Sequence, residues 1–201
     1  MLILGLTGGI ACGKSTVSGM LRELGAVIVD GDELSRELTG PDGAALPAIR
    51  LAFGETVFSE DGSLNRGALG ERIFSSEAER QRLDGIMQPL LRELILRRIR
   101  EVEAVGAEVC VLDMPLLYEK NLDRLCHRVW CVWLPEEEQL RRLMLRNGLS
   151  RQQALERVAS QLSPEEKARR ADDIIDNSGT PEETGCRVRT LYRELRERSG
   201  R

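Results

Sequence analysis

The chain has 201 residues and a formal net charge of −4, with 41% hydrophobic and 31% charged residues. This length suits one globular core with short excursions, and the composition is that of an ordinary soluble domain. The acidic balance excludes a protein whose whole surface binds nucleic acid, and no apolar run approaches the roughly 20 residues of a bilayer-spanning helix. We therefore expect no nucleic-acid partner and no membrane association.

The cysteines and the first residues bear on the cellular compartment. Five cysteines are an odd number without a CxxC spacing, and with a single histidine they give no credible zinc site. The first residues lack the basic segment and the cleavage site of a signal peptide. These features predict a reduced, cytoplasmic protein. They leave the oligomeric state open, with a homo-oligomer among the states considered.

The first 30 residues alternate between strand and helix patterns. Residues 2–6 form an apolar run that enters a Gly-rich turn, and residues 14–24 have helical spacing that stops at Gly25. Residues 26–29 form a second short apolar run. Strand, helix and strand at this spacing indicate a βαβ unit, and therefore a parallel sheet.

Three later apolar runs extend this sheet to five strands. Residues 109–112 and 129–134 are strongly apolar, and residues 174–175 form a weaker fifth run. Strands that are apolar on both faces are typical of a parallel sheet covered by helices. We therefore predict an α/β fold with a five-stranded parallel sheet flanked by helices.

Two long segments depart from this core. Residues 40–106 open with turn residues and then read as helical, with Pro89 expected to kink or split the helical segment 76–105. Residues 136–163 read as an Arg-rich pair of helices. The first segment is too long for a simple crossover, so we expect a helical excursion there and a helical lid in the second.

Residues 8–15 carry the most specific motif, because they fit G-x-x-x-x-G-K-[ST]. Gly8 and Gly13 let the backbone turn around phosphate oxygens that a Cβ would block. Lys14 reaches the β- and γ-phosphates, and the Ser15 hydroxyl coordinates Mg2+. A Gly-rich turn without a ligand is the alternative, but a strand precedes the motif and a helix follows it.

The motif predicts a P-loop NTPase fold that binds ATP and Mg2+ and transfers the terminal phosphoryl group. Backbone N–H groups of the loop and the start of the following helix supply the phosphate contacts. The predicted nucleotide-binding residues are Gly8, Gly9, Ile10, Ala11, Cys12, Gly13, Lys14, Ser15 and Thr16.

Two strand ends carry acids that suit phosphoryl transfer. Asp30 and Asp32 follow the second strand, at the carboxyl edge where ligands bind in open α/β sheets. Asp32 can orient an acceptor hydroxyl and take its proton, or it can simply cap the helix predicted over 33–38. Asp113 ends the run 109–112 in the Walker-B form, which holds Mg2+ through water, with a plain strand-end acid as the alternative.

The lid and the end of the fifth strand offer further nucleotide contacts. Arg142, Arg146 and Arg157 can neutralise charge in the transition state, although a solvated helix face would look the same. No Asn-Lys-x-Asp motif for reading guanine is present, and Asn177 after the fifth strand is a candidate for contacts to adenine.

With these residues in place, the chain resembles the dephospho-CoA kinase family over nearly its whole length, from Gly5 to about Tyr192. The similarity covers the P-loop, the two acids after the second strand and a series of further motifs. These are Asn65-Arg66, Ile73-Phe74, Gln88-Pro89, Pro115-Leu116-Leu117-Tyr118-Glu119, Gln139 with Arg142 and Arg146, Gln161, and Ala171-Asp172-Asp173-Ile174-Ile175-Asp176-Asn177.

The resemblance implies ATP-dependent phosphorylation of the ribose 3′-hydroxyl of dephospho-CoA, giving CoA and ADP. It implies Asp32 as the catalytic base. Lys14 of the P-loop motif and Arg142 of the Arg-rich lid are the other catalytic candidates. Arg66 is a candidate on the acceptor side. Gln88 stands where the family commonly has His before Pro, so it is the candidate for that position's substrate contact.

The predicted organisation is a single P-loop kinase unit over residues 1–201. Its core comprises about 1–39, 107–135 and 164–201, with a CoA-side helical subdomain at about 40–106 and the lid at about 136–163. The rivals are a P-loop kinase of another nucleoside, nucleotide or small alcohol, and a nucleotide-dependent switch ATPase. Asp32 and the Arg-rich lid argue against the switch.

Besides Gln88, three positions depart from the family pattern. Ala11 and Cys12 stand where the family loop usually has Gly-Ser or similar, and Gly31 replaces a common Ala between the two acids. Ala11 and Cys12 are small and the loop binds through its backbone, so phosphate binding should survive. Cys12 raises the question of thiol-sensitive activity.

Overall fold

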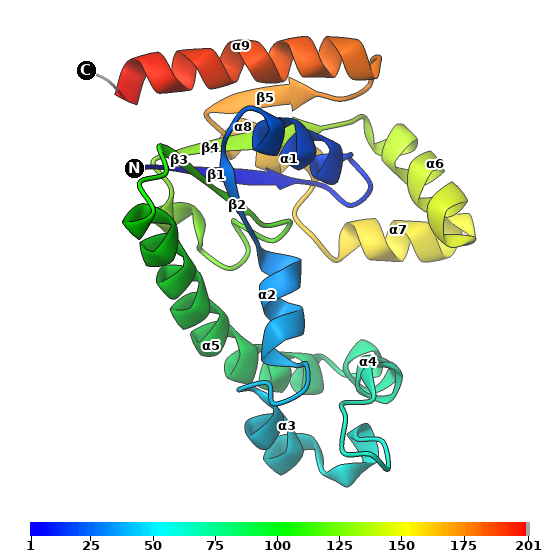
Figure 1. The fold of residues 1–201 in the computed structure, drawn as a ribbon. Helices are drawn as coiled ribbons and strands as arrows, with labels where there is room; N and C mark the ends of the chain where they lie inside the picture. The colour runs from blue at the N-terminus through cyan, green and yellow to red at the C-terminus, as the bar shows by residue number, and fades with distance from the viewer. Residues whose placement is uncertain (200–201) are drawn as a thin grey trace. The chain divides into compact units, whose positions relative to one another are not determined.

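The computed structural model describes residues 1–199 and divides the chain into two compact units (Figure 1). The first unit comprises Met1–Val29 and the chain from Val102 onward, and the second comprises Asp30–Glu101. Among the described residues, no helix combines the length and the apolar character that crossing a membrane requires.

The first unit contains a five-stranded sheet in the order β2-β3-β1-β4-β5. Its central strand β1 runs parallel to β3 and β4, and β4 runs parallel to β5. The five-stranded parallel sheet expected from the apolar runs is confirmed. The strands are β1 Leu2–Gly8, β2 Val27–Asp30, β3 Val109–Asp113, β4 Arg128–Trp133 and β5 Asp173–Asp176.

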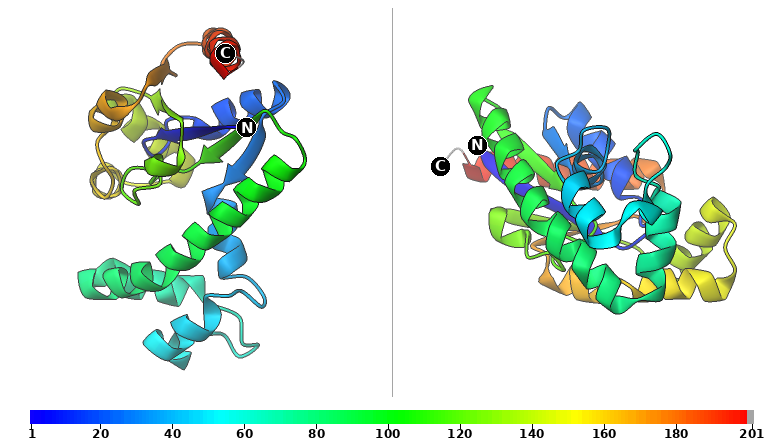
Figure 2. Two further views of the ribbon diagram at one scale, coloured as in Figure 1. Left: turned by 90° about the vertical axis from the view of Figure 1, so that its left-hand side faces the viewer. Right: turned by 90° about the horizontal axis from the view of Figure 1, so that it is seen from below.

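Successive side chains of a strand point to opposite faces of the sheet, so an apolar strand presents apolar side chains on both faces. Helices cover both faces of this sheet and bury those side chains. On one face, Leu4 and Leu6 of β1 share a core with helices α1 (Lys14–Glu23) and α9 (Pro181–Ser199). These two helices also contact each other, and α9 is the red helix of Figures 1 and 2. On the other face, α8 (Pro164–Arg170) packs against β1 and β4.

The Arg-rich segment forms two helices, α6 (Glu136–Asn147) and α7 (Arg151–Ala159). Gly148 ends α6 at a φ of 64°, and Ser150 begins α7 with a complete capping box. The two helices share a small apolar core of their own, against which two residues of the P-loop also pack. The core residues are Leu140, Leu143, Ala154 and Val158, and the loop residues are Ile10 and Ala11.

The second unit is built around the helices α2 (Gly31–Leu38), α3 (Leu46–Phe53), α4 (Arg66–Ser75) and most of α5 (Glu77–Ala104). Pro89 lies inside α5, which continues through it as one helix. The expectation that Pro89 could split this segment is therefore wrong. A proline removes only one backbone N–H donor from the helix, so the turns on either side of it can keep their own hydrogen bonds.

Candidate active site

The loop between β1 and α1 has a backbone that requires glycine at two positions. Gly13 adopts a φ of 88°, and a Cβ there would lie 2.1 Å from Nδ2 of Asn177. At Gly8 a Cβ would lie 2.5 Å from the carbonyl oxygen of Val132. The two glycines of the motif are thus demanded by close packing beneath the loop as well as by the turn itself.

Replacing Gly13 with Ala is expected to weaken ATP binding and to lower the free energy of unfolding by about 1–2 kcal/mol or more. The left-handed backbone is strained for Ala, and the side chain of Asn177 must move to make room for the new Cβ. Gly19→Ala is the matched control in α1. Apart from the adjoining backbone of its own helix, no atom lies within 4 Å of the new Cβ, and removing a helical Gly should stabilise by about 0.5–1 kcal/mol. Thermal unfolding and ATP titration of both variants check this. Equal behaviour of the two variants would contradict it.

The lysine of the motif is held by the acid at the end of β3. Nζ of Lys14 forms a hydrogen-bonded ion pair with Oδ1 of Asp113, whose side chain is 2% exposed. The Lys14 side chain is 16% exposed, so it is not fully enclosed by protein. Asp113 is therefore more than a solvated strand-end acid, because its carboxylate sets the position of the loop cation.

Asn177 ties three elements to the P-loop. Its Nδ2 donates to the carbonyl oxygen of Cys12 at 2.8 Å, and its Oδ1 accepts from the Thr184 hydroxyl of α9 at 2.9 Å. Its own carbonyl oxygen accepts from Arg142 of α6 at 3.1 Å. The end of β5, the start of α9 and the lid helix therefore meet at the back of the loop.

The lid arginines differ in their contacts. Arg142 bonds Asn177 and also donates from Nε to Glu138 at 2.7 Å. The hydrogen bond from Arg141, and to a smaller extent that from Arg142, lowers the pKa of Glu138 to about 2. This carboxylate therefore stays charged and orients the Arg142 guanidinium. Arg146 and Arg157 are exposed. Among these candidates the structure brings Arg142 to the P-loop.

Asp32 lies in the second unit, one residue after α2 begins. The cap of α2 is Asp30, whose Oδ1 accepts from the backbone N–H groups of Asp32 at 2.8 Å and of Glu33 at 3.1 Å. The alternative role of Asp32 as the helix cap is therefore wrong, because the preceding acid fills it. Asp32 is exposed, and its carboxylate is available for another role.

The two other candidates on the acceptor side also belong to the second unit. Arg66 begins α4 and donates from a terminal guanidinium nitrogen to the carbonyl oxygen of Thr39 at 3.3 Å. Gln88 is exposed in the middle of α5. The structure shows no contact between these two side chains among the described residues.

The residues of the loop fit a nucleoside triphosphate with Mg2+. No side chain caps α1, so the positive end of the helix faces the loop without competition from a protein side chain. Ser15 and Thr16 are exposed in its first turn. The hydroxyl of Ser15 and the carboxylate of Asp113 are hard oxygen ligands of the kind that Mg2+ prefers.

Comparison with known proteins agrees with this geometry. A family model described as Dephospho-CoA kinase matches residues 2–183. A dephospho-CoA kinase of Geobacter sulfurreducens is 45% identical over 96% of this chain and 98% of its own length. Among solved structures, TT1252 from Thermus thermophilus superposes with a TM-score of 0.80 at 34% identity, covering 96% of this chain and 97% of the other. Dephospho-CoA kinase from Campylobacter jejuni gives 0.73 at 26% identity, with 97% of both chains covered.

The chain belongs to the dephospho-CoA kinase family. It is therefore a kinase, and the P-loop fold predicted from residues 8–15 is confirmed. Family membership supports ATP-dependent phosphorylation of dephospho-CoA as its reaction. It does not favour a kinase for another acceptor or a nucleotide-dependent switch.

Cys12, which departs from the usual loop sequence of the dephospho-CoA kinase family, is buried. Its side chain is 1% exposed, and burial raises the pKa of its thiol to about 11. Because the thiolate is the nucleophile, burial and this raised pKa predict a thiol that is protonated and slow to react near neutral pH.

We expect iodoacetamide at pH 8 to label exposed Cys186 first and to leave kinase activity intact. Intact mass and peptide mapping over time would follow the labelling, with the urea-unfolded chain as the reference for full modification. A Cys186→Ser variant should take up label slowly. Loss of activity in step with labelling of Cys12 would contradict the protection of the loop thiol.

Two supporting residues of this dephospho-CoA kinase site, Gln139 and Lys167, have a burial that the sequence does not reveal. Gln139 of the lid is 1% exposed and packs against the P-loop. A Cβ added at Gly9 would lie only 1.9 Å from Nε2 of Gln139. Lys167 is fully buried although it lies in a strongly charged helix. Helical periodicity does not reveal either, because a polar residue on a helix is ordinarily solvated.

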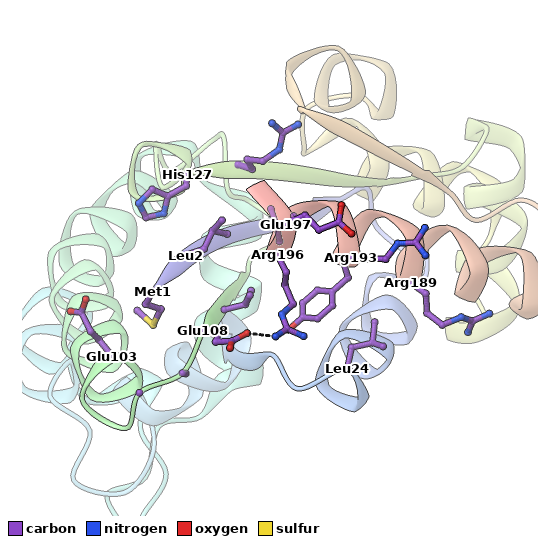
Figure 3. Close-up of a pocket in the computed structure, with 16 residues that line it drawn as sticks. Met1, Leu2, Leu24, Glu103, Glu108, His127, Arg189, Arg193, Arg196 and Glu197 are labelled. Carbon is purple, nitrogen blue, oxygen red and sulfur yellow. Dashed lines mark ion pairs between the residues drawn. The ribbon is translucent and has the colours of Figure 1, made fainter. Parts of the chain in front are cut away.

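A large groove lies away from this site (Figure 3). The groove has a volume of about 1330 Å³. One side is lined by residues at or just before the starts of β1, β3 and β4, which are Met1, Leu2, Glu108 and His127. The other side is lined by α9, where Arg196 pairs with Glu108 at 2.6 Å. The first side lies at the amino-terminal ends of the strands. Ligands of open α/β sheets bind at the carboxyl ends, so the groove is not the nucleotide site of a dephospho-CoA kinase.

Proposed function

We propose that this chain transfers the γ-phosphoryl group of Mg2+-bound ATP to the ribose 3′-hydroxyl of dephospho-CoA. The products are CoA, ADP and the proton released by the hydroxyl. The observation that carries the proposal is the ion pair between Lys14 and Asp113 at the P-loop, in a chain of the dephospho-CoA kinase family.

The loop residues from Gly8 to Thr16 bind the phosphates in this proposal. Backbone N–H groups and the start of α1 contact the phosphate oxygens, and the Lys14 ammonium neutralises the β- and γ-phosphates. Arg142 adds a second cation from the lid, where Glu138 and Asn177 already orient it. Arg146, exposed near the end of α6, is a further candidate for nucleotide contact when the lid closes.

Asn177 contributes to nucleotide binding through the loop. Both polar groups of its side chain are engaged by protein, with Cys12 on one side and Thr184 on the other. We therefore assign it the role of holding the Cys12 carbonyl oxygen, so that the neighbouring N–H groups stay directed at the phosphates. Its backbone and that of the following residues remain candidates for contact to adenine.

Ser15 and Asp113 would hold Mg2+, Ser15 directly and Asp113 through water. When bound, Mg2+ would offset the negative charge that develops on the phosphate oxygens during transfer. Asp113 keeps Lys14 in register with the same phosphates. Through Mg2+ and Lys14, the two residues would thus place two cations beside one transferring group.

The acceptor side is assigned to the second unit. Asp32 orients the ribose 3′-hydroxyl and takes its proton, which is a general-base role worth about 10²–10⁴ in rate. Arg66 and Gln88 bind the acceptor, with Gln88 replacing the His that the family commonly has. Residues 40–106 are then the CoA-side subdomain, and residues 136–163 the lid that excludes water as a competing acceptor.

We place this reaction in the cytoplasm. The five cysteines are free thiols, which suits a reducing compartment. Dephospho-CoA is the small-molecule partner in this assignment.

A coupled ADP-release assay tests the function, run with ATP and Mg2+ in the presence and absence of dephospho-CoA. ADP formation that depends on dephospho-CoA, with CoA formed in equal amount, is the expected result. A panel of nucleosides and small alcohols serves as the control for acceptor choice. Slow ADP release that is indifferent to dephospho-CoA would overturn the acceptor assignment.

A further inference from the structure

Lys167 is a fully buried lysine that the proposed mechanism does not use. It lies in α8, on the face of the sheet opposite α1, and its side chain is 0% exposed. A buried ammonium is costly unless hydrogen bonds and a counter-charge compensate it. Its Nζ donates to the carbonyl oxygen of Pro115 at 2.6 Å and lies 3.0 Å from Oε1 of Glu119.

The Pro115 carbonyl oxygen is shared by two donors. Besides Lys167, the hydroxyl of Thr7 donates to it at 3.2 Å. Thr7 is 0% exposed and directly precedes Gly8 of the P-loop. A carbonyl oxygen has two lone pairs, so this single atom connects α8, the segment after β3 and the end of β1.

The segment after β3 is held along its length. The N–H of Met114 donates to the carbonyl oxygen of Leu6 at 3.0 Å, which continues the sheet by one residue. Pro115 has no N–H and ends the ladder. Further along, Oε1 of Glu119 also accepts from the backbone of Leu162 at 3.0 Å. Residues 114–119 are thus anchored at both ends by α8 and the residues before it.

We propose that Lys167 is a positioning residue for phosphoryl transfer, which holds the segment after β3 so that Asp113 keeps Lys14 in place. Asp113 lies two residues before Pro115, and Lys14 is paired with its carboxylate. A shift of the Pro115 carbonyl oxygen is therefore passed to the loop cation through one short stretch of backbone. The inference rests on the proposed roles of Lys14 and Asp113 in the reaction.

Lys167→Met tests this role because it keeps an unbranched side chain, one heavy atom shorter, and removes the charge. We expect kcat to fall by about 10²-fold, the effect of misplacing a reacting group by about 1 Å. The KM for dephospho-CoA should stay within about threefold, because no contact to the acceptor is removed. Arg169→Met is the matched control on the same helix: its side chain is 73% exposed and pairs with Glu166 within α8, and it should leave kcat unchanged.

A double-mutant cycle separates positioning from a structural role. If Lys167 acts through Asp113, kcat of Lys167→Met/Asp113→Asn should be close to that of the slower single variant. The inference would be overturned if the fall in kcat of the double variant equalled the product of the falls of the two single variants to within about twofold. A lowered Tm for Lys167→Met with wild-type kcat per folded molecule would also overturn it, because that pattern is a structural role alone.

Thr7→Val keeps the test decisive should Lys167→Met fail to fold. It removes the other donor to the Pro115 carbonyl oxygen while preserving side-chain shape, and we expect a smaller fall in kcat that is again non-additive with Asp113→Asn. Wild-type kcat in Thr7→Val together with additivity would overturn the role of this carbonyl oxygen. The Lys14→Ala variant separates a failure of the proposed function from a failure of the positioning role of Lys167. Wild-type turnover in Lys14→Ala would mean that the proposed function fails, whatever the Lys167 variants do.

Discussion

Replacing Lys14 with Ala is expected to lower kcat/KM for ATP by about 10³-fold or more, the scale seen when a preorganised cationic group is removed from a phosphoryl-transfer site. The Lys14 ammonium is preorganised because Asp113 holds it at the end of β3, with the Asp113 side chain 2% exposed. Because the Asp113 side chain is almost fully buried, solvent screens the ion pair that holds Lys14 only weakly.

The measurement is steady-state kinetics with ATP titrated at saturating dephospho-CoA, together with direct ATP binding. Arg22→Ala is the matched control, because Arg22 is an exposed cation near the end of the same helix and its loss changes the net charge equally. Thermal unfolding of both variants shows whether Lys14→Ala is still folded when assayed. A folded Lys14→Ala enzyme with wild-type kcat/KM would refute the assignment.

Replacing Asp32 with Asn is expected to lower kcat by about 10²–10⁴, the usual contribution of a general base, while ATP binding stays unchanged. Asn keeps the size and the polarity of the side chain but cannot take a proton from the acceptor hydroxyl. The helix itself should be unaffected, because Asp30 supplies the cap of α2 and Asp32 supplies only a backbone N–H.

Glu33→Gln is the control for Asp32→Asn, since Glu33 is the next residue of α2 and is likewise exposed. It should retain wild-type kcat, which would show that the loss belongs to one position and not to the charge of the helix start. Turnover and ATP affinity are measured for both variants under the same conditions. Wild-type kcat in Asp32→Asn would remove Asp32 from the role of base.

The local parts of this protein were predictable from the sequence. The five strands are short apolar runs, and the largely buried runs β1, β3 and β4 show themselves without knowledge of their neighbours. The P-loop was equally clear because Gly8, Gly13 and Lys14 act within eight consecutive residues. Ser150 and Gln153 form a capping box for the same reason: the interacting groups are three residues apart.

Choices between adjacent or similar residues were decided by tertiary structure. Asp30 and Asp32 are both good helix caps by residue type, and only the backbone path from β2 into α2 selects Asp30. Arg142 and Arg146 are one helical turn apart, yet Arg142 alone of the pair reaches Asn177, because β5 brings that residue to the lid. Residue type states what a side chain can do, and its surroundings decide which one does it.

The buried polar contacts behind the loop were beyond the sequence altogether. Asn177 bonds Cys12 across a separation of 165 residues, and Lys167 bonds Pro115 across 52. No local pattern records such pairs, because they arise only when the parallel strands bring distant segments to one edge of the sheet. The sequence by itself determined the strands, the phosphate loop and the family. The tertiary structure alone decided which polar groups support that loop, since burial and hydrogen bonding depend on neighbours that are remote in the chain.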